Sequence, residues 1–584
     1  MKFRYPHNKS ILRLCAASLS LASLLGACSG EIGGDGVTMP PDDDEPGAAG
    51  GRGPGPAPGG TGGTGGPSPS VCSGDQATLG KPLVGRLSAR QYQRAVKALL
   101  TGRTVPDVSG MSEAYVDGFA NFAGQGTTLE DITLLESSAR LLTDKMQATS
   151  VASCSGSNAA AQKKCGHDFI SDFGRKAFRR PLTADEANRW KGFFDESMGA
   201  HGYEDAVRMV VEAFVQAPQF LYVTEVGEPV SGDDKVRRLT QNELATRLAL
   251  VLTDAPPDAQ LISAAEAGAL DDPSKLTEQV QRLLDSANGR ESVANFHSQW
   301  LHLDTFQDLA RDPEGIEYSD ALEQGLRDGL TRFVSHVFWD RGGSVADLLT
   351  SRDGFINQTT APVYEGVSAN GSNLSQVQLK ADRRAGLLTQ AGWLAQHAKV
   401  DTDHPVSRGF FVSDRLVCNK PPQPTPDIVA RFPEIPDDLA PMTEREFLET
   451  FHEEVDGCRG CHLAFDMFGF AFSHYDSVGR WRDTVKVKGV TKELDASGTI
   501  VNTVDLDGTF DGAVSLSERL ANSASVQRCF VSHWATYLSR RTVEPDAACV
   551  IDPVIQEVGG QAGSMSDIVK SIVKSEAFRR FRVD

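Results

Sequence analysis

Residues 87–100 read Leu-Ser-Ala-Arg-Gln-Tyr-Gln-Arg-Ala-Val-Lys-Ala-Leu-Leu, a polar start followed by apolar residues at helical spacing. Ser88 suits a helix N-cap, because its side-chain oxygen can accept a hydrogen bond from a backbone N–H that has no partner within the helix. Tyr92, Val96 and Leu99 recur at intervals of three and four residues, which places them on one helical face. The stretch therefore predicts an amphipathic helix whose apolar face packs against other helices.

The same pattern recurs through most of the chain. Capping boxes, a threonine followed three residues later by glutamate, begin at Thr183, Thr240 and Thr443. Pro181 and Pro218 are expected to stop or kink the helices before them. Further helices are expected over Ile132–Met146, Glu291–Leu303, Ala321–Trp339, Arg384–His397, Ser515–Arg540 and Ser566–Phe581.

Strand patterns are few. Alternation near Thr484–Val490 and Gly498–Val504 predicts one small hairpin. The sequence therefore predicts a mainly α fold with at most a small β-hairpin. The proline-rich stretch Pro421–Pro441 is the clearest break, and it separates a large helical body from a C-terminal unit.

That C-terminal unit contains Cys458-Arg-Gly-Cys461-His462, the pattern that attaches a c-type haem. The two thiols add across the haem vinyl groups, and His462 then supplies the proximal nitrogen to iron. Four phenylalanines follow and are suited to wall the haem edge: Phe465, Phe468, Phe470 and Phe472. The pattern predicts a C-terminal cytochrome c-like helical unit holding one haem c. A redox disulfide and half of a zinc site are the alternatives, but no thioredoxin-like strand–helix pattern and no second Cys/His pair accompanies the motif.

The sixth haem ligand is left open by the sequence. Met467 lies only five residues beyond His462, which favours the proximal side for its side chain. The order of segments in small c-type domains favours Met565 or His533, and His474 and Met442 are further candidates. An open sixth position would instead permit peroxide or small-ligand chemistry.

Two other clusters carry metal-type side chains. Asp401-Thr402-Asp403-His404 precedes a proline and is expected to form a capped turn, with a metal site as the alternative. Asp505-Leu506-Asp507-Gly508, with Asp511, is rich in oxygen donors but lacks the EF-hand spacing. Turn chemistry is the leading interpretation there, and calcium the alternative.

The chain begins with the cations Lys2, Arg4, Lys9 and Arg13 and no acidic residue, and the apolar run Ile11–Leu25 completes the layout of a secretory signal. Leu25-Gly26-Ala27-Cys28 resembles the lipobox at which the bacterial lipoprotein signal peptidase cuts before cysteine. We therefore expect a lipid anchor on Cys28, firmly held by two or three acyl chains. Ser29 favours the outer membrane. The alternative is ordinary cleavage that leaves Cys28 as a free thiol.

Residues 29–70 are dominated by Gly and Pro and cannot bury enough apolar surface to fold. As a flexible tether they would hold the body roughly 35 Å from the membrane. The formal charge of −20 becomes −24 once the four cations of the signal are removed. This charge argues against nucleic acid or anionic lipid surfaces as partners.

Six cysteines remain outside the signal, the anchor and the haem motif, and an even number suggests three disulfides in an oxidising compartment. Short loops favour Cys154–Cys165 and Cys529–Cys549. Cys72–Cys418 would then be the third pair.

Taken together, these stretches resemble a family of exported bacterial proteins built from the domain-of-unknown-function units 1587, 1595, 1592, 1588 and 1585. The stretches that carry the resemblance are Arg86–Tyr92, Ala177–Thr183, Ala217–Tyr222, Glu243–Leu248, Gln299–Leu301, His404–Gly409, the Cys418 region with its prolines, Cys458–His462, Gly469–Phe472, Asp476, Gly479-Arg480, Asp507-Gly508 and Tyr537–Arg541. Met467 stands where the family usually has proline, and Ser539 replaces a glycine. The resemblance implies a cytochrome-like protein without naming a substrate.

The expected order of units follows from the motifs and the resemblance. Residues 1–27 form the signal peptide and 28–70 the anchor and linker. Helical units follow at 71–160, 161–225, 226–370, 371–490 (with the CxxCH motif) and 491–584. The leading functional hypothesis is an electron-transfer lipoprotein of the cell envelope that docks a redox partner protein. The alternatives are a haem-dependent peroxidase or oxidase, and a haem-free binding or scaffold lipoprotein.

Overall fold

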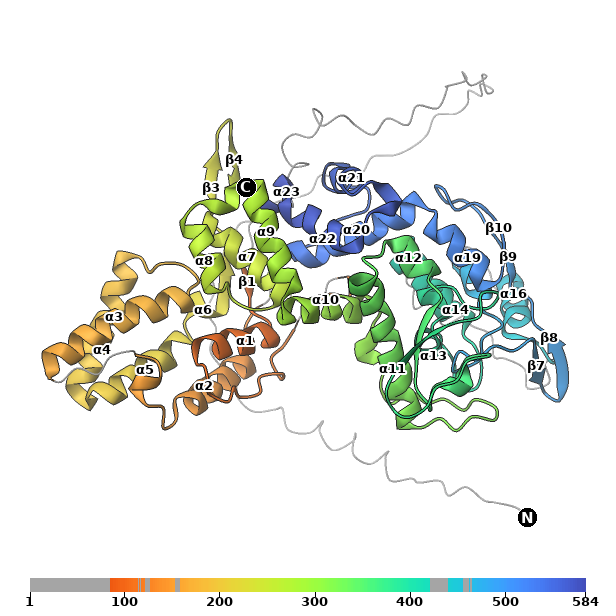
Figure 1. Ribbon diagram of the computed structural model, residues 1–584, viewed down its shortest axis with the longest axis horizontal. Helices are drawn as coiled ribbons and strands as arrows, with labels where there is room; N and C mark the ends of the chain where they lie inside the picture. The colour runs from red at the N-terminus through yellow and green to blue at the C-terminus, as the bar shows by residue number, and fades with distance from the viewer. Residues whose placement is uncertain are drawn as a thin grey trace, which may run out of the picture. The chain divides into compact units, whose positions relative to one another are not determined.

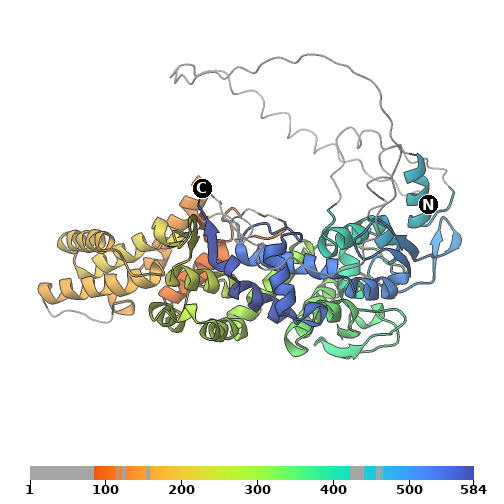
Figure 2. The ribbon, with the colours of Figure 1, turned by 90° about the horizontal axis from the view of Figure 1, so that it is seen from above.

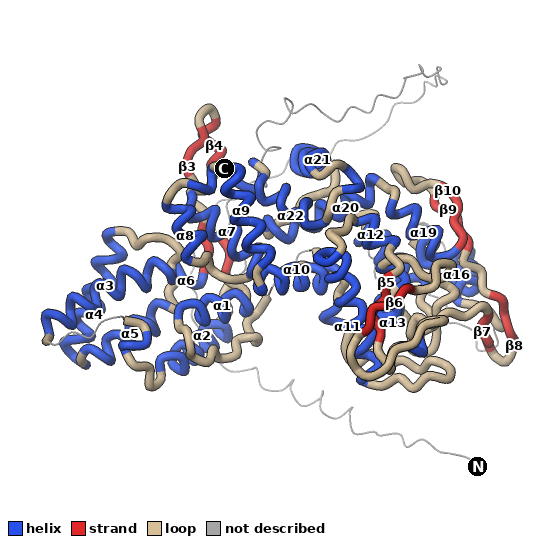
Figure 3. The backbone as a smooth tube through the Cα atoms, in the orientation of Figure 1, coloured by secondary structure: helices blue, strands red, loops and turns tan. Residues whose placement is uncertain are grey.

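Helices dominate the computed structural model, and the expectation of a mainly α fold is confirmed (Figure 3). The structure describes residues 84–583 except 114, 116, 121–125, 153–157, 421–439, 455–461 and 463–464. The signal segment, Cys28, the tether, Cys72, Cys154, Cys458 and Cys461 therefore lie outside the described residues. None of the helices that are described combines the length and the apolar character of a membrane span.

The first described part is a helical bundle closed by a short strand pair. Ser88 caps its first helix as predicted, because its side chain accepts from the backbone of Gln91 and the Gln91 side chain returns to the backbone of Ser88. Helices α3, α4 and α5 lie side by side (Figures 1 and 2). The elements are β1 (Val84–Arg86), α1 (Ala89–Leu99), α2 (Leu129–Thr143), α3 (Ala159–Ala177), α4 (Ala184–His201), α5 (Tyr203–Phe214), α6 (Pro218–Leu221) and β2 (Tyr222–Thr224).

The rest of the chain is again mostly helical. The capping boxes predicted at Thr183, Thr240 and Thr443 are all present. In the part of the chain that the structure describes, two π-helical turns interrupt the pattern, at His336–Asp340 and Val412–Leu416. The main helices are α7 (Gln241–Thr253), α8 (Ala259–Glu266), α9 (Pro273–Asp285), α10 (Ala287–Trp300), α11 (Asp320–Ser335), α12 (Val345–Thr350), α13 (Ala391–Gln396), α14 (Pro405–Phe411), α16 (Glu444–Glu454), α18 (Asp466–Phe470), α19 (Gly512–Ala521), α20 (Ala524–Ser539), α21 (Ala548–Glu557), α22 (Met565–Lys574) and α23 (Glu576–Arg579).

Several expected helices are shorter than the apolar pattern indicated. The stretch 515–540 is divided into α19 and α20, because Ser523 caps a new helix by accepting from the backbone of Val526. Only Ala391–Gln396 of the stretch 384–397 is α-helical. The last expected helix ends early, and its final residues form strand β11 (Arg580–Arg582).

The strands also differ from the single hairpin expected. The two predicted segments do not pair with each other, since β7 (Thr484–Val487) pairs with β8 (Val490–Glu493) and β9 (Ser497–Ile500) with β10 (Gly508–Asp511). Lys488 and Gly489 both have positive φ, +47° and +85°, which suits a tight two-residue hairpin turn. The other pairs among the described residues are β1–β2, β5 (Asp353–Ile356) with β6 (Ser375–Gln378), and β11–β4–β3, in which β3 is Glu228–Val230 and β4 is Asp233–Arg238.

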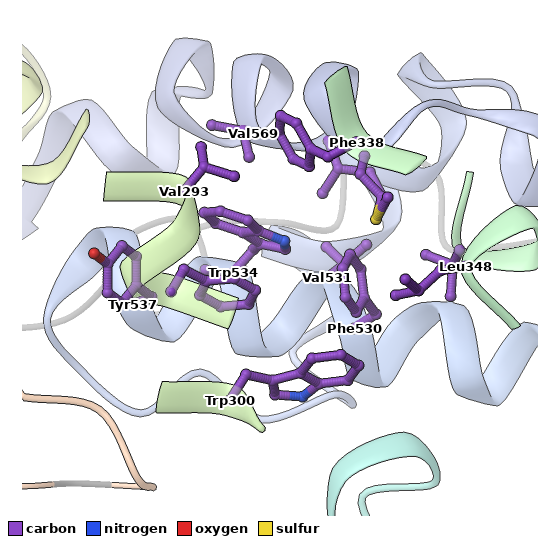
Figure 4. Close-up of a cluster of buried hydrophobic side chains, with 14 of the residues drawn as sticks. Val293, Trp300, Phe338, Leu348, Phe530, Val531, Trp534, Tyr537 and Val569 are labelled. Atoms are coloured by element: carbon purple, nitrogen blue, oxygen red, sulfur yellow. The ribbon is translucent and has the colours of Figure 1, made fainter. Parts of the chain in front are cut away.

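A large apolar core joins segments from both sides of the proline-rich stretch. Helix α20 runs through it, and Trp534 stacks on Phe296 of α10 with ring centroids 3.6 Å apart. Figure 4 shows Trp534 among Val293, Trp300 and Val569, from helices before and after that stretch. The described residues before and after the stretch 421–441 thus share one apolar core, while the division of the chain into units stays a prediction.

The disulfide pairing also differs from the one expected. Cys418 is bonded to Cys529, with Cα atoms 5.5 Å apart, so the expected pairs Cys529–Cys549 and Cys72–Cys418 are wrong. Helix α20 packs on the π-helical turn that precedes Cys418, which brings residues 111 positions apart into contact. Cys165 and Cys549 are disulfide-bonded as well. The pair Cys154–Cys165 stays a prediction.

One buried histidine gives this core a measurable pH dependence. His297 of α10 is 4% exposed, its Nδ1 lies 2.8 Å from the carbonyl oxygen of Val293, and burial lowers its pKa to about 4. The unfolded chain therefore binds a proton near pH 6.5 that the folded chain does not, and stability falls as the pH falls below that value. Between pH 6.5 and 5.5 we expect the wild type to lose about 1 kcal/mol more than His297→Gln. Urea unfolding at both pH values measures this, and equal losses would contradict it.

Candidate functional site

His462, the last residue of the CxxCH motif, lies four residues before Asp466, the first residue of helix α18. Its Nδ1 lies 3.2 and 3.3 Å from the two carboxylate oxygens of Asp466, one helical turn further on. A carboxylate oxygen accepts, so Nδ1 carries the proton and Nε2 is the unprotonated nitrogen, the one that binds a metal in this tautomer. The His462 side chain is 21% exposed, whereas that of Asp466 is 2% exposed. A buried carboxylate thus orients a partly exposed imidazole, as is common for metal-binding histidines.

The four phenylalanines after the motif are all buried, but their roles differ. Phe465 contacts the His462 ring at a centroid distance of 4.9 Å, and it also meets Phe410 of α14 edge-on at 6.0 Å. Phe472 packs against Trp393 of α13, at 5.2 Å, within the main core. Among the described contacts, Phe465 is thus the phenylalanine that packs against His462. Phe472 instead attaches the segment after α18 to the main core.

Helix α18 is held in place by an unusually close crossing with α14. A Cβ atom on Gly409 would lie 2.1 Å from the carbonyl oxygen of Phe465, and one on Gly469 would lie 2.0 Å from that of Pro405. Only glycine leaves room for two backbones at this separation. The glycines of the stretches His404–Gly409 and Gly469–Phe472 therefore fix the position of the helix that begins beside His462.

Gly409→Ala tests this crossing. The added methyl group meets backbone atoms that cannot rotate away, and overpacking of this kind costs about 2–3 kcal/mol. We expect the midpoint of urea unfolding to fall accordingly. Gly192→Ala is the matched control, because Gly192 lies within α4 with nothing within 4 Å of the added Cβ. That change is expected to stabilise slightly, by about 0.5–1 kcal/mol, and an equal effect of both changes would contradict the account.

Arg408 locks the segment after α18 onto the core. Its side chain is fully buried, and its donors reach backbone carbonyls only. The accepting oxygens, with distances, belong to His397 (3.1 Å), Phe472 (3.0 Å), Tyr475 (2.9 Å), Leu394 (3.2 Å) and Asp476 (3.0 Å). Burial lowers the pKa of Arg408 to about 10, which still leaves the guanidinium charged at neutral pH. The arginine thus ties α13 to the loop that follows the haem motif.

The five candidates for the sixth ligand are scattered over different environments. Met565 is fully buried in the main core at the start of α22, and His533 lies buried in α20 beside the disulfide. His474 donates from Nδ1 to the carbonyl oxygen of Arg482, and its ring stacks on Trp481 with centroids 4.4 Å apart. Met442 lines a cavity of about 500 Å³, and Met467 is half-buried in α18.

In the two other predicted clusters, the side chains make contacts that are typical of turns and helix caps. Asp403 pairs with Arg482 at 2.5 Å and accepts from Thr402, while burial lowers the pKa of His404 to about 4. Asp505 accepts from Ser523 and Ser525 at the start of α20. Asp507 accepts from the backbone and hydroxyl of Thr503. These contacts match the leading interpretation of both stretches.

One cluster of sulfur and nitrogen side chains was not predicted from the sequence. Cys418, Cys529 and His533 offer sulfur and nitrogen atoms that all lie within 4.8 Å of one another. It is the one group of three such side chains found among the described residues. Because the two sulfurs are bonded to each other, they are not thiolate ligands in this state. The spacing of Cys529 and His533, one helical turn apart, was the available indication.

Four family models match consecutive parts of the chain. Each is described as a protein of unknown function: DUF1595 over residues 165–225, DUF1592 over 239–365, DUF1588 over 384–485 and DUF1585 over 507–578. The DUF1588 model, which covers the CxxCH motif, bears the cytochrome-type name PSCyt3. The 1587-like start stays a prediction. No curated protein and no solved structure matches the chain.

Proposed function

We propose that this chain, which carries the DUF1595, DUF1592, DUF1588 and DUF1585 units of a cytochrome-like family, binds one covalent c-type haem and transfers electrons in the cell envelope. The observation that carries the proposal is the pairing of His462 with buried Asp466 directly after the CxxC cysteines. A histidine held in one tautomer by a buried carboxylate is suited to bind iron through Nε2.

Each part of the site then has a stated task. Cys458 and Cys461 would form the thioethers, and His462 would be the proximal ligand. When bound, the haem supplies a one-electron couple whose potential depends on its ligands and their hydrogen bonds. Asp466 orients His462 and makes its imidazole more electron-rich, and Phe465 covers one side of the ring. The glycine crossing and Arg408 keep α18 in place, so that this geometry is rigid.

The proposal includes the location of the protein. A lipid anchor on Cys28 followed by the Gly/Pro-rich tether would hold the body at the outer membrane, close to a redox partner protein. The strongly acidic composition favours a partner with a basic surface.

The first experiment is expression of the full chain together with cytochrome c maturation machinery. We expect a band that stains for haem after denaturing electrophoresis, because thioether bonds survive denaturation. An unstained band would overturn the proposal. The reduced spectrum with and without carbon monoxide then tests the function, since an electron-transfer haem with two protein ligands leaves it unchanged. Rapid carbon monoxide binding would favour a peroxidase or oxidase instead.

Asp466→Asn tests the role of the carboxylate. The amide oxygen can still accept from Nδ1, but the negative charge that stabilises the oxidised iron is lost. We therefore expect haem to be retained and its reduction potential to rise, as measured by spectroelectrochemical titration. Asp340→Asn is the matched control, because Asp340 pairs with Nδ1 of His336 at 3.0 Å with the same spacing. A potential that stays the same in Asp466→Asn, or shifts equally in both variants, would contradict the assigned role.

A further inference from the structure

The Cys418–Cys529 disulfide lies between the π-helical turn Val412–Leu416 and helix α20. Cys529 is completely buried, whereas Cys418 is half-buried and lines a cavity of about 160 Å³. Arg415, His533 and the exposed Lys420 line the same cavity. One sulfur of the pair is therefore open to a small reactant, and the other is enclosed.

His533 places a hydrogen-bond donor against the enclosed sulfur. Its Nε2 lies 3.2 Å from the carbonyl oxygen of Arg415, 3.5 Å from Sγ of Cys529 and 3.8 Å from Sγ of Cys418. Since a carbonyl only accepts, Nε2 carries the proton and its N–H is shared with the sulfurs. Burial lowers the pKa of His533 to about 3, so the imidazole stays neutral and keeps this donor at ordinary pH.

The backbone at Cys418 is held in an unfavourable conformation. Its φ is +55°, in the left-handed region, which costs a non-glycine residue roughly 1–2 kcal/mol. The π-helical turn just before it is a second local irregularity, of a kind often found at functional sites. Exposed disulfides are reduced more readily than enclosed ones, because a thiolate can reach one of their sulfurs.

We propose that Cys418–Cys529 is a thiol–disulfide exchange site that accepts two electrons from a dithiol. A thiolate of the dithiol enters the cavity and bonds to Sγ of Cys418, while the Cys418–Cys529 bond breaks and Cys529 leaves as a thiolate. The N–H of His533 stabilises that thiolate. The second thiol of the reductant then attacks the mixed disulfide and releases Cys418. The dithiol becomes a disulfide, and its two protons end on Cys418 and Cys529.

The chain contains its own references for testing this exchange. Cys165 and Cys549 are also disulfide-bonded, and Cys165 is 3% exposed. The folded full chain is treated with dilute dithiothreitol, alkylated at intervals and digested for peptide mass spectrometry. We expect Cys418 and Cys529 to become alkylated at least tenfold faster than the buried Cys165. Equal or slower labelling of the Cys418–Cys529 pair would overturn the proposal, whether or not haem is present.

A monothiol identifies the attacked sulfur. With reduced glutathione in place of the dithiol, the mixed disulfide is expected on Cys418, the sulfur that lines the cavity. An adduct on Cys529 would contradict the assigned direction of attack.

His533→Asn tests the donor, with His297→Asn as the matched control because His297 is also a buried histidine. Loss of a hydrogen bond to a thiolate is expected to slow reduction of Cys418–Cys529 roughly tenfold in the His533 variant only. Thermal unfolding curves of both variants verify that each is folded at the temperature at which the reduction rates are measured. Equal rates of Cys418–Cys529 reduction in the two folded variants would show that His533 takes no part in the reaction. The exchange site itself is then still tested by the labelling rates of the cysteines in the wild-type chain.

Discussion

Arg408→Ala is expected to destabilise the protein by about 4 kcal/mol, the largest effect of a single change outside the haem ligands. The reason is that the guanidinium is fully buried and satisfies only backbone carbonyls. Removing it leaves these oxygens in a water-free environment without donors, and each unpaired group of this kind costs about 1–3 kcal/mol. The urea midpoint of the apoprotein measures the loss.

Two variants make this expectation specific. Arg408→Lys keeps the positive charge, but the compact ammonium group has too few donors to reach all the carbonyl oxygens. We therefore expect this variant to be less stable than the wild type but more stable than Arg408→Ala. Arg140→Ala removes an arginine whose side chain is 70% exposed and paired with Glu136, and it is expected to change stability by less than about 0.5 kcal/mol. Similar losses for Arg408→Ala and Arg140→Ala would show that the carbonyl cluster does not hold this segment.

His462→Ala is expected to lower the haem content by more than about tenfold, since loss of even a hydrogen-bond partner of a metal-binding histidine costs that much. The variant keeps both cysteines but lacks the proximal nitrogen. Haem per chain is measured by the pyridine haemochrome spectrum of purified protein. The fold itself should be retained, because the His462 side chain is 21% exposed and lies outside the main core.

His336→Ala is the matched control for that loss. His336 pairs with Asp340 in the same arrangement that joins His462 to Asp466, but it lies in the π-helical turn after α11. We expect its haem content to equal that of the wild type. Equal haem content in the His462 and His336 variants would show that His462 is not the proximal ligand.

The sequence was most informative where local rules apply. The caps at Ser88, Thr183 and Thr240 follow from hydrogen bonds within four residues, and all three are present. The mainly α fold follows from the same short-range patterns. The break between α19 and α20 was missed because Ser523, a capping residue, lies within a continuous apolar pattern.

Features that depend on distant residues were not predictable. Cys418 and Cys529 are 111 positions apart, and no local pattern indicates that α20 packs on the turn before Cys418. Arg408 resembles an ordinary helical arginine until five carbonyls from two other segments surround it. Asp466 was visible at helical spacing from His462, but its burial depends on the packing of α18 against α14.

The most direct test of a covalent haem at Cys458, Cys461 and His462 is the intact mass of the full chain matured with cytochrome c machinery. The mass measured under denaturing conditions is predicted to exceed that of the same chain expressed without the machinery by one haem. In the double variant Cys458→Ser, Cys461→Ser the two masses are predicted to be equal. A wild-type chain without the added mass, or a double variant that still carries it, would contradict the account.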